Sequence, residues 1–353
     1  MKKTMMRAAA VLLFTAVGLI LFSGISQVLR RKTGQEVDMM QVLYHIPEQS
    51  ADVLVLGSSH GYMGIDENLM WTEFGIPSFA MCSSSQSPAV SYYTLKEVLK
   101  DQSPKVVLME LYTFYYDTQN LLTEPEHAQL SKGVDPLRLG EFKVEEIGDL
   151  FREMSWKERL NWYLPFLKYH SRWKELVAYD FDPMYFLRGS KVTFQTRPAE
   201  DPGMTDELGE LFDYNMSYFE KIRALCEENG ISLVVFTTPI ATGSEESFRL
   251  KIGANNALEQ YMEQQGIPYL YYQKLNETGI DFSADFFDET HLNTRGMEKI
   301  TRHMGKWLKE NYELPDHRGD AAYSRYDTDA ALYREYRDRL EQNQSGGGNI
   351  ADD

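Results

Sequence analysis

Short apolar runs alternate with helical patterns along most of the chain. The strand-like runs span residues 51–57, 105–111, 232–237 and 269–272, and the first of them ends in Gly-Ser-Ser. Apolar runs of four to seven residues that alternate with helices are typical of a parallel sheet covered on both faces. We therefore expect an α/β protein with three layers, α/β/α, built on a parallel sheet.

Apolar residues at helical spacing predict the helices that connect and follow these strands. The helical patterns fall at residues 91–100, 214–229, 255–265 and 294–311. Residues 123–202 break the alternation with short, aromatic-rich amphipathic segments, which predicts an insertion or lid upon the sheet domain.

Composition divides the chain into three parts. Residues 1–34 contain the apolar segment 8–29, which has 22 residues without an ionisable side chain and basic residues on both flanks. At about 1.5 Å per residue, a helix of this length crosses a hydrocarbon core of roughly 30 Å. Residues 35–313 hold the α/β domain with its insertion, and residues 314–353 hold a charged helix pattern followed by a flexible, glycine-rich tail.

The apolar segment has two interpretations. One is a cleaved signal peptide, because Gly24 and Ser26 are small enough for a peptidase site. The other, which we favour, is an uncleaved anchor. The basic flanks are balanced, and no second span follows, so this segment exports either the whole body or none of it. We expect a single-pass membrane protein whose body is extracytoplasmic.

The body of the protein is strongly acidic. The 353 residues include 36 Lys and Arg against 53 Asp and Glu, for a net charge of −17, and residues 1–34 contribute six basic residues and no acidic one. A body of this charge repels phosphate backbones, so we expect no nucleic-acid partner.

Cysteines and histidines give no sign of a metal centre. Cys82 and Cys226 are too few for a disulfide framework or a four-cysteine zinc site, and they form either one bridge or two unpaired buried thiols. The seven histidines show no close ligand spacing. We expect neither a metal nor a cofactor.

Candidate chemistry begins where the first predicted strand ends. Gly57 allows a sharp turn there, and Ser58, Ser59 and His60 follow it. A serine at the carboxyl end of a parallel strand stands where open sheets place reactive groups. The alternative is an ordinary turn whose serines cap the next helix. His60 is expected to point away from the neighbouring serine.

Asp288 and His291 lie on a turn just before the last helix of the predicted domain. Their three-residue separation lets the carboxylate reach Nδ1 of the imidazole, while Nε2 stays free to take a proton from a serine hydroxyl. Serine needs such a base because its hydroxyl is hardly ionised at neutral pH. The alternative is a capping pair at the helix entry.

These motifs resemble those of the SGNH/GDSL hydrolase family. The resemblance rests on Gly-x-Ser at the end of an early strand and Asp-x-x-His near the end of a three-layer α/β domain, and it covers roughly residues 50–120 and 230–312. It implies a serine esterase or O-acyltransferase with Ser59 as the nucleophile, His291 as the base and Asp288 as the group that orients the base.

Within this family the sequence is most similar to a membrane-anchored branch. Gly-Ser-Ser-His at residues 57–60, Ser-Ser-Ser-Gln at residues 83–86 and the exported layout resemble DltD of lipoteichoic-acid D-alanylation and the alginate-type O-acetyltransferases. This similarity favours transfer over hydrolysis and implies a multi-span membrane acyltransferase as a partner.

The sequence departs from the family pattern at the oxyanion hole. The family's second block normally offers a glycine amide, but residues 81–86 contain no glycine, and Glu110 stands where the third block normally has an asparagine. Glu110 is expected to be the partner of a buried Arg, Tyr or backbone group. The expected oxyanion donors are Ser59, Ser84, Ser85 and Gln86.

The insertion carries a second cluster of polar side chains. His170 and Arg172 precede Trp173, a combination that favours binding of an anionic polymer or an acyl donor. The alternative is that the cluster packs the insertion against the body.

Together these features predict extracytoplasmic, serine-dependent acyl transfer on a cell-envelope polysaccharide or a teichoic-acid-like polymer. A contrasting hypothesis is a non-catalytic envelope-assembly or glycan-binding protein that retains the fold. The irregular oxyanion blocks favour that second hypothesis.

Overall fold

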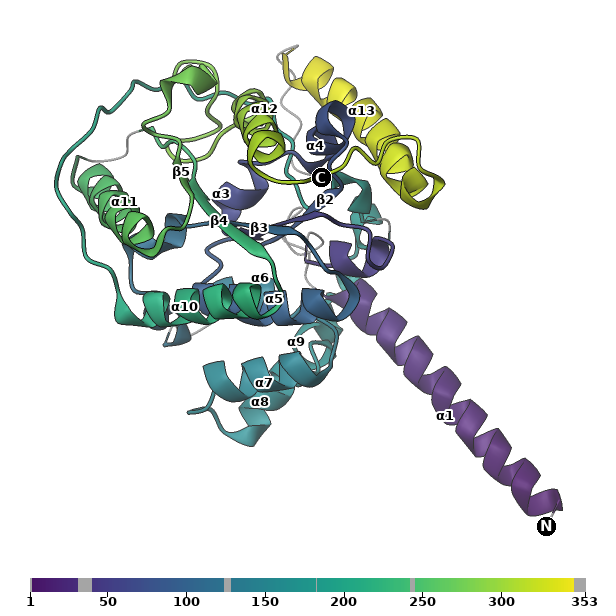
Figure 1. Ribbon diagram of the computed structural model, residues 1–353. Helices are drawn as coiled ribbons and strands as arrows, with labels where there is room; N and C mark the ends of the chain where they lie inside the picture. The colour runs from purple at the N-terminus through teal and green to yellow at the C-terminus, as the bar shows by residue number, and fades with distance from the viewer. Residues whose placement is uncertain (1, 31–39, 124–127, 182, 242–244, 346–353) are drawn as a thin grey trace.

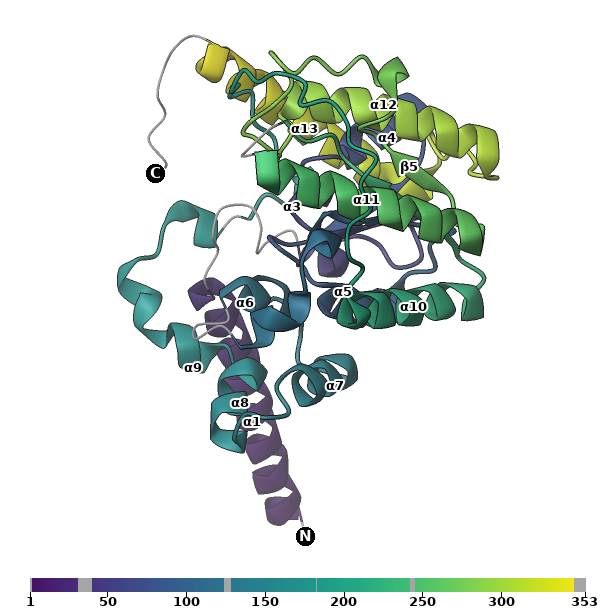
Figure 2. The same cartoon turned by 90° about the vertical axis from the view of Figure 1, so that its left-hand side faces the viewer.

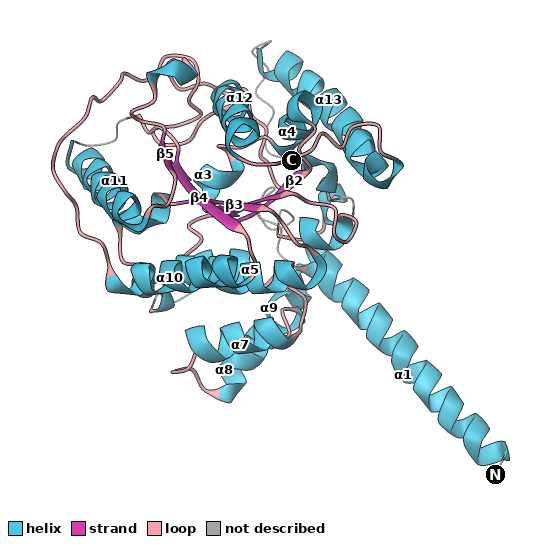
Figure 3. Ribbon diagram, viewed as in Figure 1, coloured by secondary structure: helices cyan, strands magenta, loops and turns pink. Residues whose placement is uncertain are grey.

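A computed structural model describes residues 2–30, 40–123, 128–181, 183–241 and 245–345 of the chain (Figure 1). Its centre is a sheet of five parallel strands in the order β2-β1-β3-β4-β5 (Figure 3). Helices cover both faces, which confirms the α/β fold class. The strands are β1 (Val53–Gly57), β2 (Ser78–Cys82), β3 (Val106–Glu110), β4 (Ser232–Thr237) and β5 (Tyr269–Tyr271).

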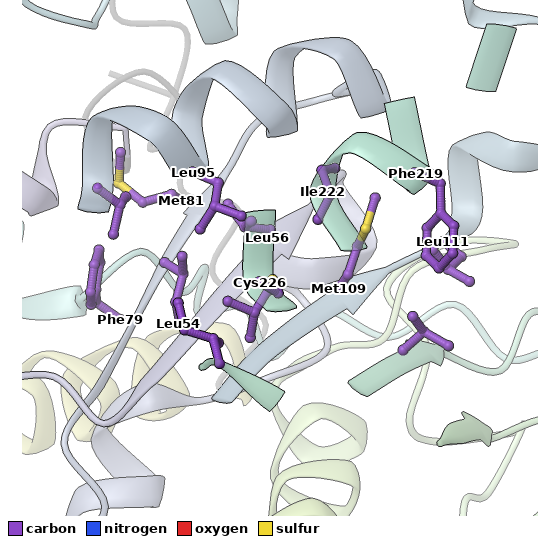
Figure 4. Packing of buried hydrophobic residues seen from close by; sticks show 14 of the residues in the cluster. Leu54, Leu56, Phe79, Met81, Leu95, Met109, Leu111, Phe219, Ile222 and Cys226 are labelled. Atoms are coloured by element: carbon purple, nitrogen blue, oxygen red, sulfur yellow. The ribbon is translucent and has the colours of Figure 1, made fainter. Parts of the chain in front are cut away.

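Alternate residues of each strand face opposite layers, because successive side chains of a strand point to opposite sides. Leu54 and Leu56 of β1 pack toward α5 (Pro88–Asp101) and α10 (Asp213–Glu228), as Figure 4 shows. Val53 and Val55 pack toward α4 (Glu67–Phe74) and α12 (Thr294–Asn311) on the other face. The helix α11 (Glu245–Gln265) packs beside β5.

The structure contains one strand, β2, that the sequence analysis does not predict. Its outer edge is covered by an irregular segment, since the Ala80 amide donates to the Arg188 carbonyl oxygen at 2.9 Å. Gly189 has a φ of 97°, and a Cβ there would lie 2.4 Å from the Ala80 carbonyl oxygen, so only glycine allows the two backbones to approach this closely.

The two cysteines lie in separate layers of the core. Cys82 packs on the α4/α12 face and Cys226 on the α5/α10 face. Both are buried free thiols.

The apolar N-terminal segment forms the long helix α1 (Lys2–Leu29), which leaves the body at one end of the molecule (Figures 1 and 2). Residues 3–29 are long and apolar enough to cross a membrane. The same length and composition would fit a signal sequence.

The predicted insertion consists of two different parts. Residues 128–181 form short helices beside α1 and against α5, and residues 190–199 run as an extended segment past the carboxyl ends of the strands. The helical part therefore does not lie upon the sheet as a lid. Its helices are α6 (Ala128–Val134), α7 (Glu141–Leu150), α8 (Trp156–Tyr163) and α9 (Phe166–Tyr169).

The charged pattern near the C-terminus forms α13 (Ser324–Ser345), which packs on α4. Tyr333 donates its hydroxyl to Asp66, the N-cap of α4. Arg188 and Asp329, both fully buried, form an ion pair at 2.8 Å that joins α13 to the segment covering β2. The predicted glycine-rich tail, residues 346–353, lies outside the described residues.

Candidate active site

The turn after β1 places Ser59 at the first position of the short helix α3 (Ser59–Tyr62). Gly57 makes the turn with a φ of 148°, and a Cβ on it would lie 2.6 Å from Cβ of Glu110. Glycine is required here for two reasons, the backbone angle and the lack of space. Ser58 caps α3, because its hydroxyl accepts from the His60 amide at 3.2 Å.

Ser59, His291 and Asp288 form a continuous row of hydrogen bonds. The Ser59 Oγ lies 2.7 Å from His291 Nε2, although 232 positions separate the two residues in the sequence. His291 Nδ1 lies 2.9 Å and 3.0 Å from the two carboxylate oxygens of Asp288. The acceptor-only carboxylate requires the hydrogen on Nδ1, which leaves Nε2 to accept the Ser59 proton.

The carboxylate of Asp288 is held in its charged form. Burial acts against the charge, but hydrogen bonds from the His291 ring and from the Thr290 and His291 amides outweigh it and lower the pKa of Asp288. An ionised Asp288 fixes the orientation of the ring and stabilises the imidazolium that forms when His291 takes a proton.

His60 lies in contact with this row. Its ring stacks on His291 with centroids 4.2 Å apart, and on its other side stacks on Tyr112 at 3.5 Å. The expectation that His60 points away from the site is therefore wrong. Burial and the nearby His291 lower the pKa of His60 well below its usual value, so a neutral ring supports His291 from one side.

A buried carboxyl group lies beneath the serine turn. Glu110, the last residue of β3, accepts from the Ser58 amide at 3.0 Å and from the Ser58 hydroxyl at 2.6 Å, and also from the Tyr112 amide. The structure thus gives Glu110 the backbone partners that were one of its expected roles. Burial raises the pKa of Glu110 to about 7 despite these hydrogen bonds.

Glu110→Gln is expected to flatten the pH dependence of stability. The pKa of Glu110 rises from 4.5 in the unfolded chain to about 7 in the folded one, so between these values only the unfolded state has lost its proton. As the pH rises from 4.5 to about 7, the contribution of Glu110 to the free energy of unfolding therefore falls by about 3 kcal/mol. Above this range it changes no further. Urea unfolding in detergent at pH 4.5 and pH 8 should give a smaller difference for Glu110→Gln than for the native protein.

Asp66 serves as the internal reference for that comparison. Burial raises its pKa to about 6, and this contribution is present in both proteins. An equal pH dependence in the native protein and in Glu110→Gln would show that Glu110 does not titrate in this window.

The turn after β2 lies next to the serine turn, since Gly57 pairs with Cys82 and its carbonyl oxygen accepts from the Ser83 amide at 3.3 Å. Ser84 contacts the Tyr62 hydroxyl of α3 at 3.2 Å, and Ser85 has a φ of 51°. Ser84 and Ser85 thus belong to the turn that lies next to the serine turn.

Gln86 has a different role from the expected one. Its Nε2 donates to the Met81 carbonyl oxygen at 3.1 Å and to the Ser91 hydroxyl at 3.0 Å, while its Oε1 accepts from the Ser83 hydroxyl at 2.9 Å. Both N–H groups of the carboxamide are engaged in holding the turn. Gln86 is therefore removed from the candidate oxyanion donors.

His170 and Arg172 lie beside α1 and not beside Ser59. Arg172 donates to the carbonyl oxygens of Leu29 at 3.0 Å and Arg30 at 2.5 Å, and it pairs with Asp180. His170 Nδ1 lies 3.0 Å from the Leu167 carbonyl oxygen. With its guanidinium occupied at the end of α1, Arg172 serves packing, the alternative role considered for it.

Several cationic side chains surround the candidate site. Lys251 Nζ lies 5.4 Å from the ring centre of Tyr112, and Lys191 Nζ lies 5.5 Å from that of Phe287. Arg197 pairs with Glu289, the neighbour of Asp288. Among the described residues, no group of three His, Cys, Asp or Glu side chains is arranged to hold a metal ion.

Comparison with known proteins finds similarity among solved structures. No protein-family model and no curated protein match the chain. A crystal structure of a Bacteroides fragilis protein, named as a candidate acylhydrolase, is similar to 77% of this chain and 94% of its own, with a TM-score of 0.37 and 11% identity. At this level the similarity carries no argument about activity.

Proposed function

We propose that the protein is a serine-dependent acyltransferase or esterase that works through an acyl-serine intermediate. The observation that carries this proposal is the hydrogen-bonded row from Ser59 Oγ through His291 to Asp288, at 2.7 Å and 2.9 Å. It joins a hydroxyl, a base and an orienting carboxylate at the carboxyl end of the sheet, in the order that nucleophilic acyl transfer requires.

The first half-reaction forms the acyl-serine ester. Ser59 Oγ attacks the acyl carbonyl carbon as His291 Nε2 takes the hydroxyl proton. The tetrahedral intermediate then collapses, the bond to the leaving oxygen breaks, and His291 returns the proton to that oxygen. The proposed donors to the oxyanion are the amides of Ser59, Ser84 and Ser85, since preorganised N–H groups stabilise the charge that develops there.

The second half-reaction uses an acceptor hydroxyl. His291 takes its proton, the oxygen attacks the acyl-serine carbonyl, and Ser59 leaves with the proton returned by His291. The acceptor is water in an esterase and a polymer hydroxyl in a transferase. The resemblance to membrane-anchored O-acyltransferases supports the second choice, with a cell-envelope glycopolymer as acceptor and a multi-span acyltransferase as partner.

The position of α1 supports an uncleaved anchor. Leu29 and Arg30 are buried against the body, and their carbonyl oxygens accept from Arg172. These contacts hold the end of α1, and Phe22, which precedes Ser26, packs on Phe166 of the insertion; cleavage near Ser26 would remove that second contact. Lys191, Arg197 and Lys251 near the site support an anionic polymer as substrate, in a chain that is otherwise acidic.

The oxyanion side of the site favours a second function, a glycan-binding protein that retains the fold. Gln86 is occupied and Glu110 replaces the expected asparagine, so the oxyanion relies on backbone amides alone. Labelling with a fluorophosphonate separates the two functions, since the reagent bonds covalently only to an activated serine.

Full-length protein is expected to bind the fluorophosphonate at Ser59, and Ser59→Ala should abolish the labelling. The matched control is Ser58→Ala, because the Ser58 hydroxyl is directed to Glu110 and not to His291. Peptide mass spectrometry identifies the labelled residue. Absence of labelling in folded native protein would favour the glycan-binding function.

A further inference from the structure

The helical part of the insertion exposes many large apolar side chains. Within residues 128–181, seven of them are between 42% and 65% exposed: Leu139, Val144, Trp156, Leu167, Trp173, Val177 and Phe181. Outside α1 and this segment, only four described large apolar side chains reach similar exposure. So many exposed large apolar side chains within one segment mark a region that contacts something other than water.

This segment is fixed beside the end of α1. The ring of Phe22 in α1 lies 5.0 Å from that of Phe166 in α9, and Arg172 bonds to the last carbonyl oxygens of the helix. The helix α9 and residues 170–174 contact α1, and α8 packs on α9, on the side of the body from which α1 leaves (Figure 2). The segment therefore lies at the level of the last turns of the apolar helix.

A cavity of about 430 Å³ lies between α1 and the segment. Its walls include Leu19 and Phe22 of α1 and Leu139 and Leu164 of the segment, and its charged lining residues are Arg30, Asp135, Arg138 and Lys143. Leu19 precedes Leu29 by ten residues, or about 15 Å along a helix. The cavity thus extends from the end of the span toward its middle, the depth of lipid acyl chains.

Two exposed tryptophans in the segment are paired with lysines. Lys157 Nζ lies 5.9 Å from the ring centre of Trp156, and Lys174 Nζ lies 5.3 Å from that of Trp173. Tryptophan prefers the boundary between headgroups and acyl chains, and lysine extends from there to the phosphates. The segment has nine basic and nine acidic residues, whereas the chain carries −17, so its charge does not oppose a lipid surface.

We propose that residues 128–181 form a membrane-contact segment that rests in the headgroup region of the leaflet where α1 emerges. The occupant of its apolar surface is phospholipid, and an acyl chain fills the cavity beside Leu19. The proposal rests on the retained anchor of the proposed function. It fixes the height and tilt of the Ser59 site above the membrane, which selects acceptors attached to or lying close to the same surface.

The test is fluorescence quenching of full-length protein in phosphatidylcholine–phosphatidylglycerol vesicles whose acyl chains carry bromine. Intact mass first establishes that the chain retains α1. Because tryptophan at the lipid boundary meets the bromine, the lipid-dependent quenching is expected to fall at least about twofold in Trp156→Phe/Trp173→Phe. The control is Trp307→Phe. Trp307 lies on α12 and packs against Tyr312, so this substitution should leave the quenching unchanged.

Other results would overturn the proposal. If Trp156 and Trp173 are quenched by aqueous iodide in vesicles and not by brominated lipid, the surface faces water or a protein partner. Both tryptophans are exposed, so their phenylalanine variants should fold, and circular dichroism of the same vesicles checks this. Fluorophosphonate labelling of the native protein in these vesicles tests the proposed reaction separately. Failure of labelling with the lipid quenching intact would contradict the proposed reaction and leave the membrane contact standing.

Discussion

Ser59→Ala and His291→Ala should each lower turnover of an aryl ester by on the order of a thousandfold or more. The two side chains act in one step, because the 2.7 Å contact between Ser59 Oγ and His291 Nε2 is the path of the proton. The double variant should therefore be no worse than either single variant. Asp288→Asn should lose less, since it disturbs only the orientation and charge of the ring. Initial rates with the full-length protein measure all four.

Ser58→Ala is the matched control for these rates. Its hydroxyl donates to Glu110 and caps α3, so its loss should lower stability by about 1 kcal/mol and leave most of the turnover. A folded Ser59→Ala protein that retained native turnover would contradict the proposed reaction.

Asp329→Ala should destabilise the protein by about 3–5 kcal/mol. Asp329 pairs with Arg188 at 2.8 Å, and both side chains are almost fully buried. Arg188 also stacks over the Tyr326 ring at 3.5 Å, so it has no route to water when its partner is removed. The change leaves a charge buried without compensation, and urea unfolding measures the loss.

The control for this loss is Glu310→Ala, which removes the exposed pair with Lys306 on α12 and should change stability by less than about 1 kcal/mol. Arg188→Met/Asp329→Leu should recover most of the stability, because apolar groups of similar volume need no partner. A similar small loss for Asp329→Ala and Glu310→Ala would mean that the Arg188 charge is compensated by other groups.

Four of the strands and the layering could be predicted from the sequence because they are local patterns. Residues 106–109 are all apolar, as expected of a strand with neighbours on both sides, and they form most of β3. β2 was harder to predict, since Ser78 and Ala80 weaken its pattern and its edge is completed by Arg188, more than a hundred positions away.

The row of Ser59, His291 and Asp288 was predictable in outline for a related reason. Ser59 directly follows a strand pattern, and Asp288 and His291 directly precede a helix pattern. Parallel strands bring their carboxyl ends to one edge of the sheet, where such residues gather. The stacking of His60 between Tyr112 and His291 leaves no such pattern, because it depends on side-chain directions within a fully packed site.

Arg172 shows the limit of composition as a guide. An arginine beside a tryptophan suggests a binding site, but its partners are the Leu29 and Arg30 carbonyl oxygens, more than 140 positions earlier. The local sequence does not distinguish an arginine that binds an anionic ligand from one that caps a distant helix.

The segment that covers β2 also protects this edge of the sheet from pairing with a second molecule. An outer strand with unpaired amides is a template on which a second chain can add a strand, and such pairing leads to aggregation. The Arg188 carbonyl oxygen occupies the Ala80 amide, and the left-handed conformation of Arg188 and Gly189 bends the covering segment out of strand geometry. At the β2 edge, the sheet therefore ends in a backbone segment on which a neighbouring molecule cannot add a strand.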